Sequence, residues 1–278
     1  MSTPPLRSPP VLVSLFLAID SLVGVIKTGL DSVYQGVWLG LLSSYNLDSL
    51  TLERYRRWPR YRSRAHNEVG LFPWEEAFFG QYLKDGTSVL VASSGGGREA
   101  WALVDRGLSV DVFDCNPDLV RVCRDLNAER NGVLGVFDAP PGDVPAGWGE
   151  GVPKHYDTIL IGWGGYTHIP GRANRVRFLG RLRSILSTSG VLALSCFQRT
   201  GEVRSMVWTH RIAKFLRKVR GAKDEVQLGD RLQGTFDHFF SEQELREELA
   251  EAGLDCLHCR SLPLLVATAG HRRPAPEN

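Results

Sequence analysis

Short apolar runs alternate with helix-like segments through the middle of the chain. Val89 to Val91 and Ser109 to Phe113 are two such runs, rich in the branched residues that favour buried strands. The segments that follow them, Arg98 to Arg106 and Asp118 to Arg130, show the apolar spacing of helices. A third strand is expected from Val133 to Asp138. Strands that alternate with helices predict an α/β fold built on a parallel, Rossmann-like sheet.

The pattern continues beyond a loop rich in proline and glycine, Ala139 to Lys154. A buried strand begins at Tyr156 in YDTILIGWGGYTHI. RVRFLGRLRSILSTSGVLALSCF then contains a helix, a break at Gly190 and another strand. Glu202 to Arg220 is expected to form one more helix before the last one.

The C-terminal region FSEQELREELAEAGLDCLHCRSLPLLVATA indicates a helix, a glycine stop and two strands. Ser241 and Glu244 form an S-x-x-E capping box at the start of that helix. Only a short, proline-containing turn separates the two strands, which permits an antiparallel hairpin but not a parallel crossover. Residues 271–278 are expected to be a disordered tail.

The N-terminal region begins with a proline-rich segment, residues 1–10, that we expect to be mobile. Apolar residues then recur at helical spacing, at Leu12, Leu15, Phe16, Ile19, Leu22, Val23 and Ile26. Asp20 interrupts the apolar stretch VLVSLFLAI, which is too short for a membrane span. We therefore expect no membrane span but an amphipathic helix that packs on the domain, or on a second subunit of a homodimer. Residues 1–80 are assigned to an N-terminal helical extension or cap.

TSVLVASSGGGREAWALVDRGLSVDVFD combines a strand, a glycine turn, a helix and a second strand in one nucleotide-binding unit. Gly95, Gly96 and Gly97 allow a tight turn and a close approach to a ligand. Asp114 ends the second strand, where its carboxylate can accept hydrogen bonds from both hydroxyls of a ribose. We therefore expect an adenosine-containing ligand. Because Gly95, Gly97 and Ala100 also fit the loose G-x-G-x-x-G/A pattern, an NAD-dependent oxidoreductase is the alternative.

Charge and composition favour a small partner. The net charge of the 278 residues is +2, which gives no electrostatic reason to expect nucleic acid. Basic residues do cluster from Arg54 to His66, among aromatics, and from Arg211 to Lys223. Interleaved arginines and aromatics can bind single-stranded nucleic acid, but a solvated cationic surface or a clamp for a small acidic substrate is preferred.

The five cysteines indicate reduced thiols in the cytoplasm, because an odd and scattered set does not form a disulfide framework. Cys256 and Cys259 form a C-x-x-C pair on an expected strand, where we expect their side chains to point to opposite faces. Zinc binding there is disfavoured without a second pair. We expect no metal, since carboxylates and histidines do not cluster at ligand spacing in the sequence.

These motifs resemble those of the class I S-adenosylmethionine-dependent methyltransferases, over roughly residues 70 to 270. VLVASSGGG resembles the first family motif, VDVFD the second, and YDTILIGWGGYTHI the motif of the fourth strand. The resemblance implies a seven-stranded sheet that ends in an antiparallel hairpin, with S-adenosylmethionine as cofactor. Residues 81–270 would form this domain.

The chain departs from the family pattern in its first motif. Val91 stands where the family has an acid that orients the methionine portion of the cofactor, and Ser93 stands where the family has glycine. That task would fall on backbone groups, on Ser93 or Ser94, or on the N-terminal region. Glu75 is a candidate substitute, although an exposed acid in the first turn of a helix is the alternative.

The resemblance implies a cofactor site made of Ser93, Ser94, Gly95, Gly97, Asp114, Cys115, Asp138 and Trp163. Asp138 resembles the family acid at the adenine amino group, and Asp143 is its rival. His168 is a candidate general base and Tyr166 a candidate contact to the acceptor, because both follow the fourth strand. His238 and His210 are held in reserve as bases.

The sequence therefore predicts a cytoplasmic enzyme that transfers a methyl group from S-adenosylmethionine to an oxygen, nitrogen or carbon atom of a small molecule. Gly162-Trp163-Gly164-Gly165 occupies the place of the N/D-P-P-Y/W tetrapeptide of amino-methylating enzymes that act on nucleic acid and glutamine. A protein that binds S-adenosylmethionine without transferring its methyl group is a further alternative.

Overall fold

The structure is a computed structural model that describes residues 11–83, 87–130, 135–148, 155–201, 204–261 and 264–272. The expected mobile start and most of the expected C-terminal tail lie outside the described residues.

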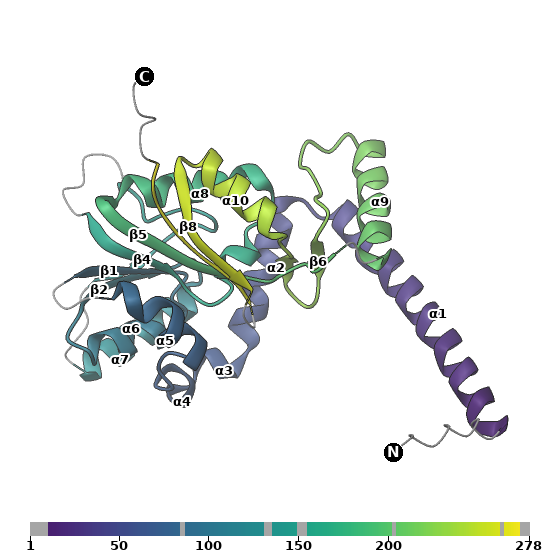
Figure 1. Cartoon of the computed structure of the whole chain (residues 1–278), viewed down its shortest axis with the longest axis horizontal. Helices are drawn as coiled ribbons and strands as arrows, with labels where there is room; N and C mark the ends of the chain where they lie inside the picture. Colours follow the sequence, from purple (N-terminus) through teal and green to yellow (C-terminus); the bar gives the residue numbers. More distant parts are fainter. Residues whose placement is uncertain are drawn as a thin grey trace, which may run out of the picture.

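A seven-stranded sheet forms the centre of the molecule (Figure 1). Its strands are β1 (Ser88–Ala92), β2 (Ser109–Asp114), β3 (Val136–Asp138), β4 (Tyr156–Ile161), β5 (Leu186–Cys196), β8 (Leu254–Ser261) and β9 (Leu265–His271). Their order is β3-β2-β1-β4-β5-β9-β8, parallel from β3 to β5, with β9 antiparallel to both of its neighbours. The expected α/β fold with a terminal antiparallel hairpin is confirmed.

Helices cover both faces of the sheet. The remaining elements are α1 (Val11–Leu41), α2 (Ser44–Arg57), α3 (Pro59–Arg62), α4 (Arg64–Asn67), α5 (Pro73–Phe79), η1 (Gly80–Tyr82), α6 (Arg98–Val104), α7 (Pro117–Arg130), η2 (Gly165–His168), α8 (Arg172–Ser184), α9 (Arg204–Val219), α10 (Glu242–Glu251), and the short hairpin β6 (Asp230–Leu232) and β7 (Phe236–His238). Trp101 of α6 and Cys123 of α7 pack in one apolar core. Phe178 of α8 and Leu245 of α10 pack in the other. The sheet is thus buried on both sides, as parallel sheets are.

Helix α1 differs from the expectation. It runs as one helix from Val11 to Leu41 and projects away from the body of the molecule (Figure 1). The expectation that its apolar residues pack on the domain is wrong, because every described side chain from Val11 to Leu30 is exposed. The expectation that VLVSLFLAI is too short for a membrane span considered only the residues before Asp20. The helix continues past Asp20 and is long and apolar enough to cross a membrane.

The end of α1 is held by α9. Gly36 and Gly40 allow the two helices to approach closely, because an added Cβ would lie 2.8 Å from the Cβ of Ile212 or 2.7 Å from that of Leu216. Arg217 then donates to the carbonyl oxygens of Leu39 at 3.0 Å and Leu42 at 2.8 Å. These oxygens lie in the last turn and would otherwise lack helical partners.

The C-x-x-C pair is arranged differently from the expectation. The register of β8 against β9 shifts between Cys256 and His258, so that Cys256 lies opposite Ala269 and Cys259 opposite Ala267. Because Ala267 and Ala269 are on one face of β9, both thiols lie on one face of the sheet. A hydrogen bond with Cys259 lowers the pKa of Cys256 to about 7.

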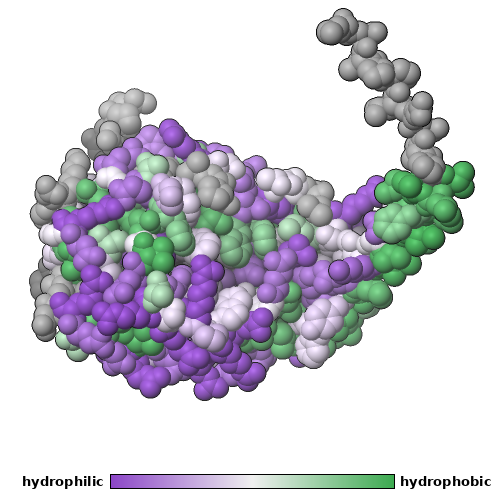
Figure 2. Space-filling model, turned by 90° about the horizontal axis from the view of Figure 1, so that it is seen from below, coloured by the Kyte–Doolittle hydropathy of each residue, from purple (hydrophilic) through white to green (hydrophobic). Residues whose placement is uncertain are grey.

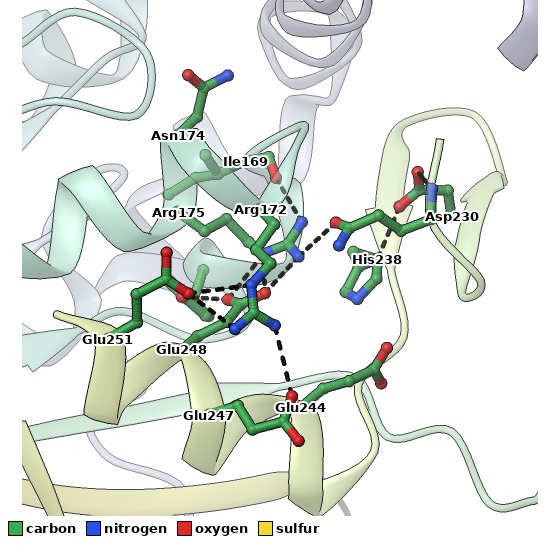
Figure 3. Close-up of polar contacts among 12 residues, drawn as sticks. Ile169, Arg172, Asn174, Arg175, Asp230, His238, Glu244, Glu247, Glu248 and Glu251 are labelled. Carbon is green, nitrogen blue, oxygen red and sulfur yellow. Dashed lines mark hydrogen bonds and ion pairs between the residues drawn. The ribbon is translucent and has the colours of Figure 1, made fainter. Parts of the chain in front are cut away.

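A buried ion pair joins α8 to α10 (Figure 3). The Arg175 guanidinium donates to Glu248 at 2.5 Å from Nη2 and at 3.0 Å from Nε, and neither side chain is more than 1% exposed. Arg175 also donates to Gln227 Oε1 at 2.7 Å, and the backbone N–H of Gln227 donates to Asp230 at 2.8 Å. Asp230 in turn contacts Nδ1 of His238 at 2.6 Å. The pair therefore connects the helices to the β6–β7 hairpin.

Loss of Arg175 should destabilise the fold strongly, because Glu248 would become a buried carboxylate without its cation. For Arg175→Met we expect the free energy of unfolding, measured by urea denaturation, to fall by about 3–5 kcal/mol. Arg172→Met is the matched control. Arg172 lies on the same helix and pairs with Glu251 at the surface at 2.8 Å, where a pair contributes at most about 1 kcal/mol. Equal losses in the two variants would contradict the importance of the buried pair.

Candidate functional site

A pocket lies beyond the carboxyl ends of β1, β2 and β4, where open α/β sheets bind their ligands. Its walls come from the loop after β1, the end of β2, the loop after β4 and the region of α2 to α4. The lining residues are Thr51, Leu52, Tyr55, Tyr61, His66, Asn67, Ser93, Ser94, Gly95, Gly96, Arg98, Glu99, Asp114, Cys115, Asn116, Leu119, Trp163, Gly165 and His168. The N-terminal region thus forms a roof over the glycine loop.

The loop after β1 has the backbone that a close ligand contact requires. Ser93 has a φ of 55°, which is costly outside glycine, and strain of this kind concentrates at functional sites. Gly96 has no room for a side chain, since a Cβ there would lie 2.5 Å from Nδ2 of Asn67. Gly97 caps α6 and turns toward Trp101, so it shapes the loop without lining the pocket.

The carboxylate of Asp114 holds the glycine loop after β1 by a hydrogen bond. Its Oδ2 accepts from the N–H of Gly95 at 2.8 Å, and its Oδ1 accepts from the N–H of Asn116 at 2.7 Å. Each oxygen keeps a second lone pair for a ligand hydroxyl. Burial raises the pKa of Asp114, and the backbone hydrogen bonds act in the opposite direction. The acid thus lines the pocket with both of its oxygens held by backbone N–H groups.

A buried cluster of charges lies beside the loop. Arg98 donates to both carboxylate oxygens of Glu75, each at 2.7 Å, and to Glu99 at 2.6 Å. Glu75 is 1% exposed, so the alternative of an exposed helix acid is wrong. Glu75 itself does not line the pocket, but Arg98 and Glu99 do. The cluster has two carboxylates and one guanidinium. Its net charge is therefore negative and would attract a cation in the pocket.

His168 is held between two partners in the pocket. Its Nδ1 lies 3.0 Å from the carbonyl oxygen of Phe236 and 3.1 Å from the buried carboxylate of Asp237, so this nitrogen carries the proton. Its Nε2 lies 2.8 Å from the hydroxyl of Tyr55. Burial raises the pKa of Tyr55, which keeps its hydroxyl protonated and makes it the donor. The arrangement is a Tyr–His–Asp chain whose Tyr55 and His168 line the pocket.

The structure moves one candidate away from the site. Tyr166 was expected to contact an acceptor, but its side chain is fully buried and its hydroxyl donates to Glu248 at 2.6 Å. Its stacking on Phe240 fixes it in the core below the loop. Trp163, by contrast, lines the pocket with 38% of its surface exposed and its ring against Phe72.

The two candidate adenine acids also separate. Asp138 is exposed and pairs with Arg124 at 2.6 Å, outside the pocket. Asp143 lines an adjoining cavity together with Cys115 and Asp48. Burial raises the pKa of Asp48 to about 6. Asp48 and Asp143 therefore both line the adjoining cavity, whereas Asp138 at the end of β3 does not.

The reserve histidines have structural partners. His210 lies 3.1 Å from the carbonyl oxygen of Val226, and His238 is fully buried against Asp230. Neither lines the pocket. Of the three histidines considered as bases from the sequence, only His168 lines the pocket.

Several lining residues were not anticipated from the sequence. Tyr55, Tyr61 and His66 come from the arginine-rich segment that was interpreted as a cationic surface or clamp. The alternation of aromatic and basic residues was the available signal, since arginines such as Arg57 and Arg64 point outward while the aromatics face the pocket. Glu99 was not predicted, although it lies in the first turn of α6, directly after the glycine loop.

Comparisons with known proteins agree on the architecture. No protein-family model matches the chain, and no curated protein matches it. Among solved structures, the 1,6-didemethyltoxoflavin-N1-methyltransferase of Burkholderia thailandensis is 17% identical, with a TM-score of 0.58 over 84% of this chain and 92% of that one. The CcbJ methyltransferase of Streptomyces caelestis is 15% identical, with a TM-score of 0.53 over 80% and 96%. The glycopeptide N-methyltransferase MtfA is 15% identical, with a TM-score of 0.51 over 76% and 99%.

The strand order, the terminal antiparallel hairpin and these likenesses agree with the resemblance in the sequence motifs. The chain has the fold of the class I S-adenosylmethionine-dependent methyltransferases.

Proposed function

We propose that the protein transfers a methyl group from S-adenosylmethionine to a small-molecule acceptor and releases S-adenosylhomocysteine. The observation that carries the proposal is one pocket that joins Asp114 and the glycine loop to the hydrogen-bonded pair of Tyr55 and His168. Structures of this fold include an enzyme solved with 1,6-didemethyltoxoflavin and S-adenosylhomocysteine, and a glycopeptide N-methyltransferase solved with S-adenosylmethionine.

The residues present suit this cofactor. Asp114 would accept the ribose hydroxyls, and the backbone of Ser94 to Gly96 leaves room for close contact. Glu99 would take the α-ammonium group of the methionine portion, the task of the family acid that Val91 replaces. Asp143 and Asp48 would face the adenine amino group in the adjoining cavity, in place of Asp138. The bound cofactor supplies an activated methyl on a sulfonium.

The sheet favours this cofactor over NAD. Doubly wound dehydrogenase sheets have the strand order 3-2-1-4-5-6 with parallel strands. Here the strand beyond β5 is β9, which runs antiparallel and pairs with β8.

The size of the acceptor follows from the roof. Tyr55, Tyr61 and Asn67 cover the pocket from the N-terminal side, which limits access by a folded macromolecule and excludes water from the reacting atoms. The aromatic lining fits a planar or partly apolar small molecule. The cytoplasm is the compartment we propose for this chemistry, where the five thiols remain reduced.

The Tyr55–His168–Asp237 chain gives the acceptor proton a destination. The bound cofactor would supply the methyl group, and Tyr55 would take up the acceptor's proton on its oxygen. Tyr55 at the same time gives its own proton to Nε2 of His168. Asp237 stabilises the imidazolium through Nδ1. Because this chain adjoins the cofactor loop, transfer is favoured over cofactor binding alone.

Replacement of Asp114 should weaken both sulfur ligands. For Asp114→Asn, we expect the Kd values for S-adenosylmethionine and S-adenosylhomocysteine to rise about tenfold to a hundredfold, because charged hydrogen bonds to the ribose are lost. Isothermal titration calorimetry measures this directly. Asp138→Asn is the matched control and should change neither Kd, since that carboxylate pairs with Arg124 outside the pocket. Tight NAD binding by the unaltered protein would overturn the assignment.

Glu99 can be tested with a pair of ligands. Glu99→Gln should raise the Kd for S-adenosylhomocysteine about tenfold, because the α-ammonium loses a charged partner. The same variant should bind 5′-methylthioadenosine unchanged, since that ligand has no amino acid portion. Equal weakening of both ligands would mean that the substitution disturbs the loop, and it would remove Glu99 from the methionine site.

The proton chain predicts a separation of binding from turnover. In an acceptor screen that measures S-adenosylhomocysteine release, Tyr55→Phe and His168→Asn should each lower kcat by about 100-fold to 10,000-fold. The Kd for S-adenosylmethionine should stay within about threefold, because neither residue holds the adenosine. Full activity in Tyr55→Phe would exclude the relay.

A further inference from the structure

An apolar surface surrounds the first part of α1. From Val11 to Leu30, each leucine, isoleucine, valine and phenylalanine is exposed, and no described part of the chain covers them. Figure 2 shows this segment as a continuous hydrophobic arm beside a mostly hydrophilic body. Exposed apolar surface on this scale indicates a binding surface.

The apolar residues face every direction around the helix. Val11, Leu12 and Val13 follow one another, and successive residues of a helix point about 100° apart. Leu22 and Val23 repeat this arrangement further along. A second copy of the helix would bury one stripe and leave the others in water. A lipid environment covers all of them at once.

The length of the segment matches a bilayer. Twenty residues from Val11 to Leu30 extend about 30 Å as a helix, which is the thickness of the hydrocarbon core. Only Asp20 and Lys27 carry charge in this range. Lys27 lies near the end, where its long side chain can reach the headgroups. The many large apolar side chains outweigh the single carboxylate of Asp20 on the scale of insertion energies.

Aromatic residues mark the boundary where the helix meets the domain. Tyr34 and Trp38 are exposed on α1 one to two turns beyond Leu30, with their rings in edge contact. Trp208 of α9 is also exposed. It lies beside the same part of α1, since the next residue, Thr209, donates to the carbonyl oxygen of Ser32. Exposed aromatic rings at this level are typical of a membrane–water interface.

The exposed side of α9 combines basic residues with the apolar side chains of Trp208, Phe215 and Val219. Arg204, Arg211, Lys214 and Lys218 are all exposed there, and the helix contains no acidic residue. A cationic surface beside an apolar arm complements the anionic headgroups of a bilayer. The close contact of Gly36 with α9 fixes the two helices against each other, so the arm and the basic surface act together.

We propose that Val11–Leu30 spans a lipid bilayer and that the end of α9 nearest Leu30, with the exposed Arg204 and Trp208, lies at its anionic headgroups. The enzyme is thus an anchored protein whose catalytic domain lies at the membrane surface.

Membrane fractionation of the full chain tests this proposal. The chain should sediment with membranes and stay there after washes with high salt and alkaline carbonate. The purified chain should also float with vesicles of phosphatidylcholine and phosphatidylglycerol. Leu22→Arg adds a charge at the centre of the arm and should lower the ratio of membrane-bound to soluble protein about a hundredfold. Leu257→Arg is the matched control, since Leu257 is an exposed residue on β8 far from α1, and its ratio should not change.

Several results would overturn the span. A chain that carbonate releases would lie only on the surface. A soluble dimer in sedimentation velocity that Leu22→Arg dissociates would assign the arm to a second copy. A mature protein whose intact mass lacks Val11–Leu30 would make the segment a cleaved leader. Because Leu22 makes no contact with the domain, an unchanged melting temperature in Leu22→Arg confirms that the variant is folded.

Discussion

The buried ion pair between Arg175 and Glu248 is the contact on which the rest of the site depends. It joins α8 to α10 on one face of the sheet, and through Gln227 it reaches the loop before β6. The β6–β7 hairpin supplies the carbonyl of Phe236 and the carboxylate of Asp237, both of which orient His168. A charge pair that is costly to desolvate is thus retained where it fixes the geometry of a polar chain.

The N-terminal region is tied to the same hairpin. Thr51 of α2 accepts from the backbone of Phe236 at 3.2 Å, and the amide of Asn116 donates to the carbonyl of Leu52 at 3.0 Å. Gln35 of α1 accepts from the backbone of Leu232 at 3.3 Å. The N-terminal roof is therefore connected both to the β6–β7 hairpin and to the loop after β2, and residues of the roof and of that loop line the pocket.

Features set by local spacing along the chain could be predicted from the sequence, whereas contacts between distant elements could not. The glycine loop and Asp114 could be predicted because their spacing along the chain determines their geometry. The terminal hairpin could be predicted because its turn is short. Tyr55 and Glu99 could not, since their place in the pocket depends on how α2 and α6 pack. The prediction for Tyr166 was wrong for a related reason. The short η2 helix after β4 directs Tyr166 into the core, where its hydroxyl donates to Glu248, and His168 into the pocket.

The end of α1 links the proposed anchor to the catalytic site. Only Leu42 and Ser43 separate α1 from α2, and α2 carries Thr51 and Tyr55 into the roof. Arg217 donates to carbonyl oxygens at the end of α1. Gly36 and Gly40 pack α1 closely against α9. A flexible linker would let the catalytic domain turn freely above a membrane, whereas this packed junction fixes its orientation. The roof over the pocket is then held at a constant angle to the bilayer, so the same side of the pocket always faces the lipid surface.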